Sequence, residues 1–332
     1  MKKLILAAML TSTTFSVFAS QSIEVTRDNY AQAESQKMML MQEKRGEGVN
    51  QWFKYPGVPT LEQHAQIVRS NNDTVYSTAV IDTSEGATVT LPETDGRYIS
   101  LLQVDGNHFT KPMNYGSGKY KVEGTTDHVF VIVRIGTIDG SPEDIAEINR
   151  LQKQLKIEAN SSKAVPKKAF DAHTHEVVHK ELQKEFAQMG GSYAGMFGTE
   201  KSVDMKLHPL GAATGWGGAM EQDAVYQMSK NFNSMECHAV TFEDPKDKYF
   251  WSITVYNKDI YVFSDNAHVS STNAEQNDDG TYTVRFGCDG QANNITIDNP
   301  TGEWSPLMRH YGPSKAVLDK EFQPLLDIKP VK

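Results

Sequence analysis

Residues 71–82 of the chain read NNDTVYSTAVID, and this stretch decides the fold class. Asn, Asp and Thr side chains hydrogen-bond their own backbone and favour turns, whereas the residues that follow alternate apolar with small polar side chains and favour a strand. The stretch therefore predicts a turn that leads into a strand over 74–81. Asp73 either holds this turn or is a polar group at the edge of a β structure, placed to contact a ligand.

More short strands follow at close spacing. They are expected over 87–91, 97–104, 119–122 and 129–135, with Gly, Pro, Asp and Asn residues between them. A second β-rich region has strands expected over 237–242, 249–256, 281–286, 294–297 and 308–311. This spacing is typical of antiparallel sandwiches rather than of alternating strands and helices. The sequence thus predicts a mainly β protein with helical connectors and two antiparallel β-sandwich modules.

Helical periodicity is expected between and before these strands, over 26–43, 60–69, 142–157, 169–189 and 219–232. The clearest start is at Ser141, with Pro142 in the first turn and Asp144 in the third position, where it is a weaker substitute for the Glu of a capping box. We predict an N-terminal helical lead-in and β module over 20–158, a helical connector over 159–235 and a C-terminal β module over 236–332.

The first residues have the pattern of a secretory signal peptide. Lys2 and Lys3 precede an apolar stretch over 4–10, and Ala19 ends a Val-Phe-Ala cleavage pattern. We therefore expect removal of residues 1–19 and a periplasmic or secreted protein. No later apolar run approaches the roughly 18 residues that a membrane helix needs, so no membrane insertion is expected.

The charge balance argues against nucleic-acid partners. The chain has 33 basic and 42 acidic residues, and removal of the two signal-peptide lysines leaves 31 − 42 = −11. Such a surface repels phosphate backbones and anionic lipid heads, and no Lys/Arg cluster reverses its sign locally. The roughly 310 residues after the predicted cleavage exceed what one core usually holds, which agrees with two modules.

Several motifs resemble a bacterial pair of domains of unknown function, the families numbered 1254 and 1214. The 1254-like motifs are RSNNDTVYS at 69–77, LP at 91–92, GRY at 96–98 and LLQVD at 101–105. The 1214-like motifs are GWGG at 215–218, AVY at 224–226, FWSITVY at 250–256, DG at 279–280, NN at 293–294 and RHYGP at 309–313. The resemblance implies two sandwich modules of jelly-roll character, joined by helices in an exported protein. It implies no particular reaction.

The chain contains two cysteines, Cys237 and Cys288, each inside or beside a strand-like stretch. In an oxidising compartment, neighbouring strands would bring them within reach of a disulfide. The alternative is a pair of buried free thiols.

The best metal-like pattern is DAHTHEVVH at 171–179. It places His175 and His179 one helical turn apart, as two imidazole ligands of a zinc ion would lie. A third ligand would have to come from elsewhere in the fold. The alternative is that both histidines flank a packed apolar stripe that contains Val178 and Leu182. No other cofactor is expected.

Aromatic, acidic and arginine residues near the family-like motifs form the candidate ligand site, which consists of Asp73, Tyr76, Arg97, Tyr98, Trp251 and Arg309. Aromatic faces stack on sugar rings, while Asp and Arg bind hydroxyls and carboxylates. The structural alternative is that Asp73 caps its turn, Trp251 belongs to a core and Arg309 pairs with a structural acid.

The common catalytic templates are missing: no Gly-x-Ser-x-Gly, Walker, His-Glu-x-x-His or Cys-x-x-Cys pattern occurs. The sequence best supports binding of a small polar or carbohydrate-like ligand in the periplasm. One alternative is a hydrolase of envelope or extracellular material that uses Asp73, His108 or a metal at the two helical histidines. Another is a structural or surface-interaction protein. Enzymatic activity and homo-oligomerisation stay open.

Overall fold

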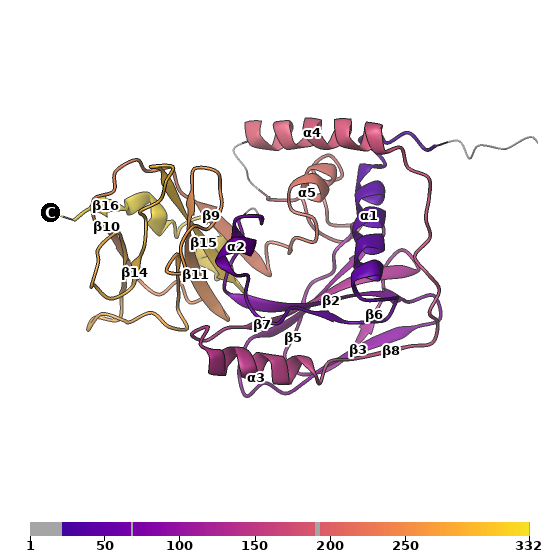
Figure 1. Ribbon diagram of the computed structural model, residues 1–332, viewed down its shortest axis with the longest axis horizontal. Helices are drawn as coiled ribbons and strands as arrows, with labels where there is room; N and C mark the ends of the chain where they lie inside the picture. The colour runs from indigo at the N-terminus through magenta and orange to yellow at the C-terminus, as the bar shows by residue number, and fades with distance from the viewer. Residues whose placement is uncertain (1–21, 68, 190–192, 332) are drawn as a thin grey trace, which may run out of the picture.

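The computed structural model describes residues 22–67, 69–189 and 193–331. The signal-peptide prediction for residues 1–19 lies outside the described residues. The protein is mainly β, and its strands form two modules that are joined by helices (Figure 1). None of the described helices combines the length and the apolar character that a membrane crossing requires.

The N-terminal module consists of two sheets and one helix packed around a shared core. The five-stranded sheet has the order β1 (Phe53–Lys54), β2 (Thr74–Asp82), β7 (His128–Gly136), β4 (Ile99–Asp105), β5 (Asn114–Tyr115). The three-stranded sheet has the order β6 (Gly118–Val122), β3 (Ala87–Leu91), β8 (Lys156–Ala159). The predicted helix start at Ser141 is confirmed: its hydroxyl accepts the Asp144 amide at the start of α3 (Pro142–Gln152).

The alternation in the opening stretch assigns the two faces of β2. Val75, Ala79 and Ile81 face the core that lies between the two sheets and α3. Tyr76 and Thr78 therefore lie on the opposite face, because successive strand side chains alternate. Toward the end of β2 this face is apolar, and toward its start it is polar.

The C-terminal module is a sandwich of two four-stranded sheets. One sheet has the order β12 (His268–Ser270), β11 (Phe250–Asn257), β15 (Trp304–Tyr311), β9 (Ala224–Met228). The other has the order β14 (Asn294–Ile295), β13 (Tyr282–Phe286), β10 (His238–Phe242), β16 (Lys329–Pro330). Short helices α6 (Lys315–Leu318) and η1 (Pro324–Asp327) follow β15. The jelly-roll character implied by the family resemblance stays a prediction.

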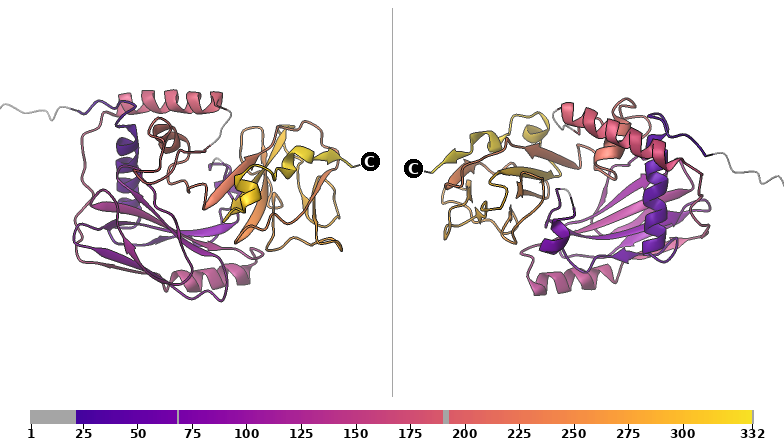
Figure 2. Two further views of the ribbon diagram at one scale, coloured as in Figure 1. Left: turned by 180° about the vertical axis from the view of Figure 1, so that it is seen from behind. Right: turned by 45° about the horizontal axis from the view of Figure 1, so that its top comes forward.

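Helices from distant parts of the chain form a separate layer above the five-stranded sheet (Figures 1 and 2). They are α1 (Tyr30–Arg45), α4 (Ala172–Gln188) and α5 (His208–Thr214), which share an apolar cluster. Gln42 of α1 exchanges two hydrogen bonds with Thr78 of β2. The small helix α2 (Leu61–His64) lies close to the C-terminal module in Figure 1.

Three helix predictions are wrong in part or whole. The helix expected over 60–69 is only the four residues Leu61–His64 of α2. The helix expected over 142–157 ends at Gln152, and Lys156–Ala159 instead form β8, which pairs with β3. The helix expected over 219–232 is not formed; Ala224–Met228 are strand β9, whose partner is β15. Local propensity could not identify either strand, because each is only four or five residues long and depends on a distant partner.

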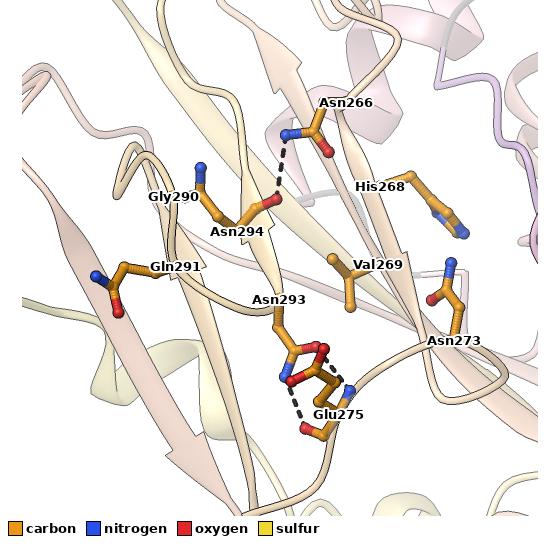
Figure 3. Close-up of a pocket in the computed structure, with 9 residues that line it drawn as sticks. All are labelled: Asn266, His268, Val269, Asn273, Glu275, Gly290, Gln291, Asn293 and Asn294. Carbon is orange, nitrogen blue, oxygen red and sulfur yellow. Dashed lines mark hydrogen bonds between the residues drawn. The ribbon is translucent and has the colours of Figure 1, made fainter.

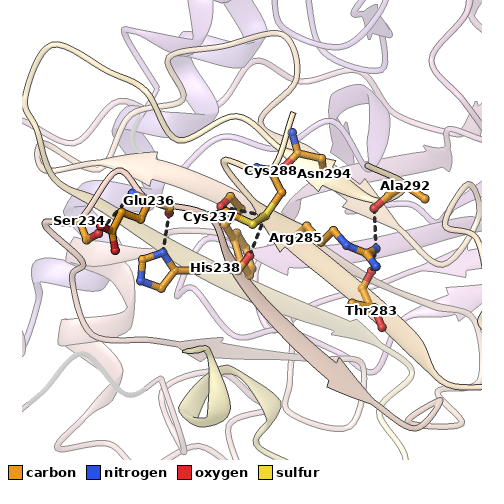
Figure 4. Close-up of a disulfide and its surroundings, with 10 residues drawn as sticks. Ser234, Glu236, Cys237, His238, Thr283, Arg285, Cys288, Ala292 and Asn294 are labelled. Atoms are coloured by element: carbon orange, nitrogen blue, oxygen red, sulfur yellow. Dashed lines mark hydrogen bonds between the residues drawn. A yellow bond between two sulfur atoms is a disulfide. The ribbon is translucent and has the colours of Figure 1, made fainter. Parts of the chain in front are cut away.

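The two cysteines are joined by a disulfide, as Figure 4 shows. Cys237 precedes β10 and Cys288 follows β13, and these strands pair antiparallel with His238 opposite Phe286. The Cα atoms of the two cysteines are 4.8 Å apart. The disulfide therefore ties together the ends of two paired strands.

Candidate functional site

The outer face of the sheet β12-β11-β15-β9 meets the polar end of the five-stranded sheet. On β15, Met308 faces the core of the C-terminal sandwich. Arg309 and Tyr311 are one and three residues further along the strand, so both lie on the opposite, outer face. The Tyr311 hydroxyl donates to Asp73 of the N-terminal module, at 2.6 Å. This junction of the two modules is the candidate site.

Asp73, at the corner before β2, is the centre of the first half of the junction. Its side chain is fully buried, and its two oxygens face different partners. Oδ2 accepts from Tyr311 and lies 4.0 Å from Arg309 Nε. Oδ1 lies 3.4 Å from Nδ1 of His268. Burial lowers the pKa of His268 below its usual value, against the opposing effect of Asp73.

Arg309 has a complete set of partners. Nη1 donates to the Thr254 hydroxyl at 3.0 Å, and Nη2 donates to the Arg69 carbonyl at 2.9 Å and to the Tyr256 hydroxyl at 2.5 Å. Burial works to lower the pKa of Arg309, but Tyr256 and Asp73 raise it above its usual value overall. This arginine therefore ties the turn before β2 to the C-terminal sheet.

Arg134, on β7, is the centre of the second half and has a different environment. In register it lies between Tyr76 of β2 and Ser100 of β4. Its Cζ is 5.4 Å from the centroid of the Tyr76 ring, a cation–π arrangement. Its recorded hydrogen bond is a long one, 4.0 Å to the Met113 sulfur. In residues 22–67, 69–189 and 193–331, no carboxylate forms an ion pair with it.

Phenol groups surround the Arg134 guanidinium in place of an acid. Burial alone would lower the pKa of Arg134, but Tyr76, Tyr98 and Tyr226 raise it above its usual value. Burial raises the pKa of Asp223, and the charge of Arg134 lowers it by a smaller amount. The Asp223 carboxylate accepts hydrogen bonds from the Tyr115 hydroxyl and the Met113 amide rather than from Arg134. Arg134 is thus a charged, desolvated group without a bound anion among the described residues.

Solvent nevertheless reaches this second half. Tyr226 is 37% exposed. Tyr76, Tyr98 and Arg134 are half-buried. Tyr226 comes from β9 and the other three come from the five-stranded sheet, so residues of both modules form this half of the junction.

Several buried oxygens at the junction also lack a hydrogen-bond partner in the described part of the chain. They are Asp73 Oδ1, Thr74 Oγ1, Ser100 Oγ and Ser252 Oγ. Thr74 and Ser100 lie near the hydroxyls of Tyr76 and Tyr98 without a hydrogen bond of normal geometry. Because buried polar groups in native proteins are normally paired, the junction is polar enough to hold water or a polar ligand.

The structure brings together four of the six predicted ligand residues: Asp73, Tyr76, Tyr98 and Arg309. The other two lie elsewhere. Arg97 donates to Asp144 at 2.5 Å and to the Gly136 carbonyl at 2.7 Å. Trp251 is 1% exposed and packs against Phe242 and Tyr282 inside the C-terminal sandwich.

The two helical histidines dock α4 onto α1. Nε2 of His175 lies 2.7 Å from Glu34, and Nδ1 of His179 lies 2.6 Å from the Tyr30 hydroxyl. Their rings stack on each other at 6.3 Å. Among the described residues, no group of three or more His, Cys, Asp or Glu side chains has the arrangement of a metal site.

A hollow of about 390 Å³ on the C-terminal module contains many amide side chains (Figure 3). Most of these amides already bind the backbone: Asn293 Nδ2 donates to the Glu275 carbonyl at 2.8 Å, and Asn266 Nδ2 donates to the Asn294 carbonyl at 3.2 Å. His268 lines this hollow, but its ring is turned away from Asn294, and its Nδ1 faces Asp73 (Figure 3). The amides therefore hold the loops in place.

The sequence alone did not point to Arg134, Tyr226, His268 or Tyr311 as residues of the site. Arg134 had a usable signal, because it is the one charged residue inside HVFVIVRIG at 128–136, an otherwise apolar strand apart from its first residue. Tyr226 was hidden by the wrong helix prediction over 219–232. Nothing local distinguishes His268, whose role depends on Asp73 of the other module.

Comparison with known proteins places these features in a family context. The family model DUF1254 (protein of unknown function) matches residues 49–119. The family model DUF1214 (protein of unknown function) matches residues 222–315. No curated protein matches the chain by sequence.

Two solved structures share the fold. The VPA0106 protein from Vibrio parahaemolyticus is similar with a TM-score of 0.71 and 19% identity, over 92% of this chain and 98% of that one. An uncharacterized protein from Burkholderia cenocepacia is similar with a TM-score of 0.52 and 17% identity, over 86% and 85% of the two chains. The chain therefore combines a DUF1254 region with a following DUF1214 region, the pair and the order that its sequence motifs predict.

Proposed function

We propose that the protein binds a small polar ligand that carries a carboxylate, such as a sugar acid. The binding site is the surface formed by Arg134, Tyr76, Tyr98 and Tyr226, here called the Arg134 surface. The observation that carries this proposal is the Arg134 guanidinium, which is half-buried against Tyr76 and has no acidic ion-pair partner in the described part of the chain. A guanidinium presents two parallel donors that match the two oxygens of a carboxylate.

The energetic argument favours an anion over a neutral ligand. A desolvated cation without a counter-charge is unfavourable, and the cost is reduced when a ligand supplies the negative charge. In water the same pair would gain little, because solvent screens it. We therefore expect the carboxylate to dominate binding and the remainder of the ligand to give selectivity.

The tyrosines suit the rest of such a ligand. Tyr76, Tyr98 and Tyr226 offer ring faces for stacking and hydroxyls for hydrogen bonds, which is the combination that sugar-like molecules require. Tyr226 belongs to the C-terminal module and the other two to the N-terminal module. Binding would therefore bridge both modules.

A thermal-shift comparison tests the proposal. Wild type is heated with galacturonate, gluconate and malate, and with galactose and glycerol as uncharged counterparts. A ligand that prefers the folded state raises the apparent stability, by about 2.7 kcal/mol at a concentration one hundredfold above its Kd. We expect a carboxylate to raise the Tm of wild type and the uncharged compounds to leave it unchanged.

Two arginine variants identify the site. Arg134→Gln should remove the carboxylate-induced shift. Arg150→Gln removes the same charge at an exposed position of α3, where Arg150 pairs with Glu147 three residues earlier, and should respond as wild type does. A shift that survives in Arg134→Gln, or the absence of a shift with every carboxylate in wild type, would contradict the proposal.

We also propose that the protein works in the periplasm or outside the cell. Support comes from the signal-peptide pattern at 1–19 and from the Cys237–Cys288 disulfide, since such bonds persist in oxidising compartments. Thiol titration of the denatured, unreduced protein should find no free thiol, and fractionation should find the mature chain outside the cytoplasm. Two reactive thiols would count against export.

The alternatives gain less support. For a hydrolase, Asp73 is engaged by Arg309 and Tyr311, and His108 is fully buried with its Nε2 accepting the Gly217 amide. For a purely structural protein, the satisfied Arg309 network is what one expects, but the unpaired Arg134 is not. The ligand-binding function accounts for both arginines.

A further inference from the structure

We propose that the Arg134 surface is catalytic and that Tyr76, after it has lost its own proton, removes a proton from the carbon next to the bound carboxylate. This inference rests on the proposed binding function and adds a reaction to it. The substrate class is a sugar acid or another acid with a hydrogen on the carbon beside its carboxylate.

The position of Tyr76 is the first argument. Tyr76 and Arg134 are paired residues of β2 and β7, so their side chains leave the sheet side by side on the same face. The guanidinium carbon lies 5.4 Å from the Tyr76 ring centroid. A carboxylate held by Arg134 would therefore present its neighbouring carbon next to the Tyr76 side chain.

The freedom of the Tyr76 proton is the second argument. Three tyrosines farther from Arg134 donate their hydroxyl protons within the protein: Tyr311 to Asp73, Tyr256 to the Ser70 carbonyl and Tyr115 to Asp223. The Tyr76 hydroxyl instead accepts from Asn71 Nδ2, at 3.5 Å. Among the described residues no hydrogen bond has Tyr76, Tyr98 or Tyr226 as its donor, so no internal acceptor holds the Tyr76 proton and it can leave to solvent.

Electrostatics support the same residue. Burial raises the pKa of Tyr76, but the Arg134 charge and the hydrogen bond from Asn71 act against burial, and the pKa falls below its usual value overall. For the tyrosines on the surrounding strands burial prevails, and their pKa values are raised: Tyr98, Tyr226, Tyr256 and Tyr311. Tyr76 is thus the phenol of this cluster that most readily becomes a base.

The proposed step balances without an oxidant or a cofactor. Tyr76 first loses its own proton to solvent. The resulting phenolate takes the proton from the carbon beside the carboxylate, the C–H bond breaks, and its electron pair moves into the carboxylate, where Arg134 stabilises the added charge. The proton can return to the same carbon. If a hydroxyl or alkoxy group leaves from the next carbon, the electron pair forms a C=C bond, and Tyr76 gives its proton to the leaving oxygen.

Deuterium exchange tests the step independently of binding. A carboxylate that raises the Tm of wild type, galacturonate in the first instance, is incubated with enzyme in D2O, and proton NMR follows the signal of the hydrogen beside the carboxylate. We expect loss of that signal with wild type. In Tyr76→Phe the rate should fall by about 100-fold or more, which is the usual contribution of a general base.

The variants separate the two proposals. Tyr76→Phe should keep the carboxylate-induced Tm shift while losing exchange, and Arg134→Gln should lose both. Tyr120→Phe, on the three-stranded sheet outside the site, is the matched control and should keep both. A carboxylate that binds wild type without exchange, or equal exchange rates in wild type and Tyr76→Phe, overturns the catalytic inference and leaves the binding function standing.

A spectroscopic titration checks the premise without any ligand. Absorbance at the tyrosinate band is followed as pH rises in wild type, Tyr76→Phe and Arg134→Gln. Wild type should show one tyrosine that ionises below the usual pKa of 10.0, missing in Tyr76→Phe and shifted upward in Arg134→Gln. Identical curves below that pH would contradict the assignment of Tyr76 as the base.

Discussion

Two arginines occupy the junction of the modules, and they differ in what surrounds them. Arg309 on β15 contacts a carboxylate, two hydroxyls and a carbonyl, all from the protein. Arg134 on β7 faces a tyrosine ring and a methionine sulfur. Both are desolvated, so burial alone does not distinguish a structural cation from a binding one. The presence or absence of an internal anion does, because only an unpaired cation gains from an external one.

The largest expected loss of stability comes from removing the Arg309 side chain. Arg309→Met leaves the fully buried Asp73 carboxylate without its cation and should lower the free energy of unfolding by about 3–5 kcal/mol. Urea denaturation measures it. A loss below about 1 kcal/mol would show that Arg309 is not the tie between the modules.

The pair of Arg97 with Asp144 supplies a second structural arginine. Arg97→Gln removes a cation from a carboxylate that is 4% exposed, so we expect a loss of about 3 kcal/mol near neutral pH and an unchanged response to carboxylates.

The pH dependence of this effect follows from Asp144. Burial raises the pKa of Asp144, but amides at 138 and 140 and the Arg97 guanidinium lower it below its usual value overall. Its folded-state pKa is thus below the unfolded value of about 3.9, and the stabilisation is complete above that value and disappears as pH falls through the folded pKa. The gap between wild type and Arg97→Gln should narrow below about pH 4. A gap that stays constant down to pH 2 would exclude the ion pair as its cause.

A smaller effect is expected from Tyr311→Phe. This change removes one hydrogen bond to the Asp73 carboxylate and leaves Arg309 in place, so the free energy of unfolding should fall by about 2 kcal/mol. Chemical denaturation of the single variant and of the double variant with Arg309→Met should show non-additive losses, because both side chains contact the same oxygen. Strict additivity would mean that the two contacts are independent.

The smallest expected change in stability comes from removing the Arg134 side chain. Arg134→Gln leaves no internal acid unpaired, and we expect the free energy of unfolding of the ligand-free protein to change by no more than about 1 kcal/mol. The same variant should lose the stabilisation by carboxylates. A loss comparable to that of Arg309→Met would instead place Arg134 among the structural arginines.

Most of the fold was accessible from local sequence patterns. The alternation after Asp73 predicts β2 and its two faces, and Ser141 with Pro142 predicts the start of α3, because these signals depend on residues that are neighbours in the chain. Strands β8 and β9 were missed, since each is short and is stabilised by a partner far away in sequence.

Only part of the candidate site could be predicted from the sequence. Asp73, Tyr76, Tyr98 and Arg309 carry recognisable motifs and do meet, whereas Arg97 and Trp251 have equally suitable chemistry and lie elsewhere. Residue type predicts which interactions a side chain can make. It does not predict which partner the chain will bring to it.

The sequence by itself determined the β-rich modules, their order and the family pair, because strand periodicity, turn residues and motifs are local properties of the chain. Only the tertiary structure decided that Arg309 receives Asp73 as a counter-charge while Arg134 receives tyrosines. The physical reason is that the state of a buried charge depends on neighbours from other strands. Asp73 precedes Arg309 by 309 − 73 = 236 residues and meets it only when the two modules dock, whereas Tyr76 reaches Arg134 through strand pairing within one sheet.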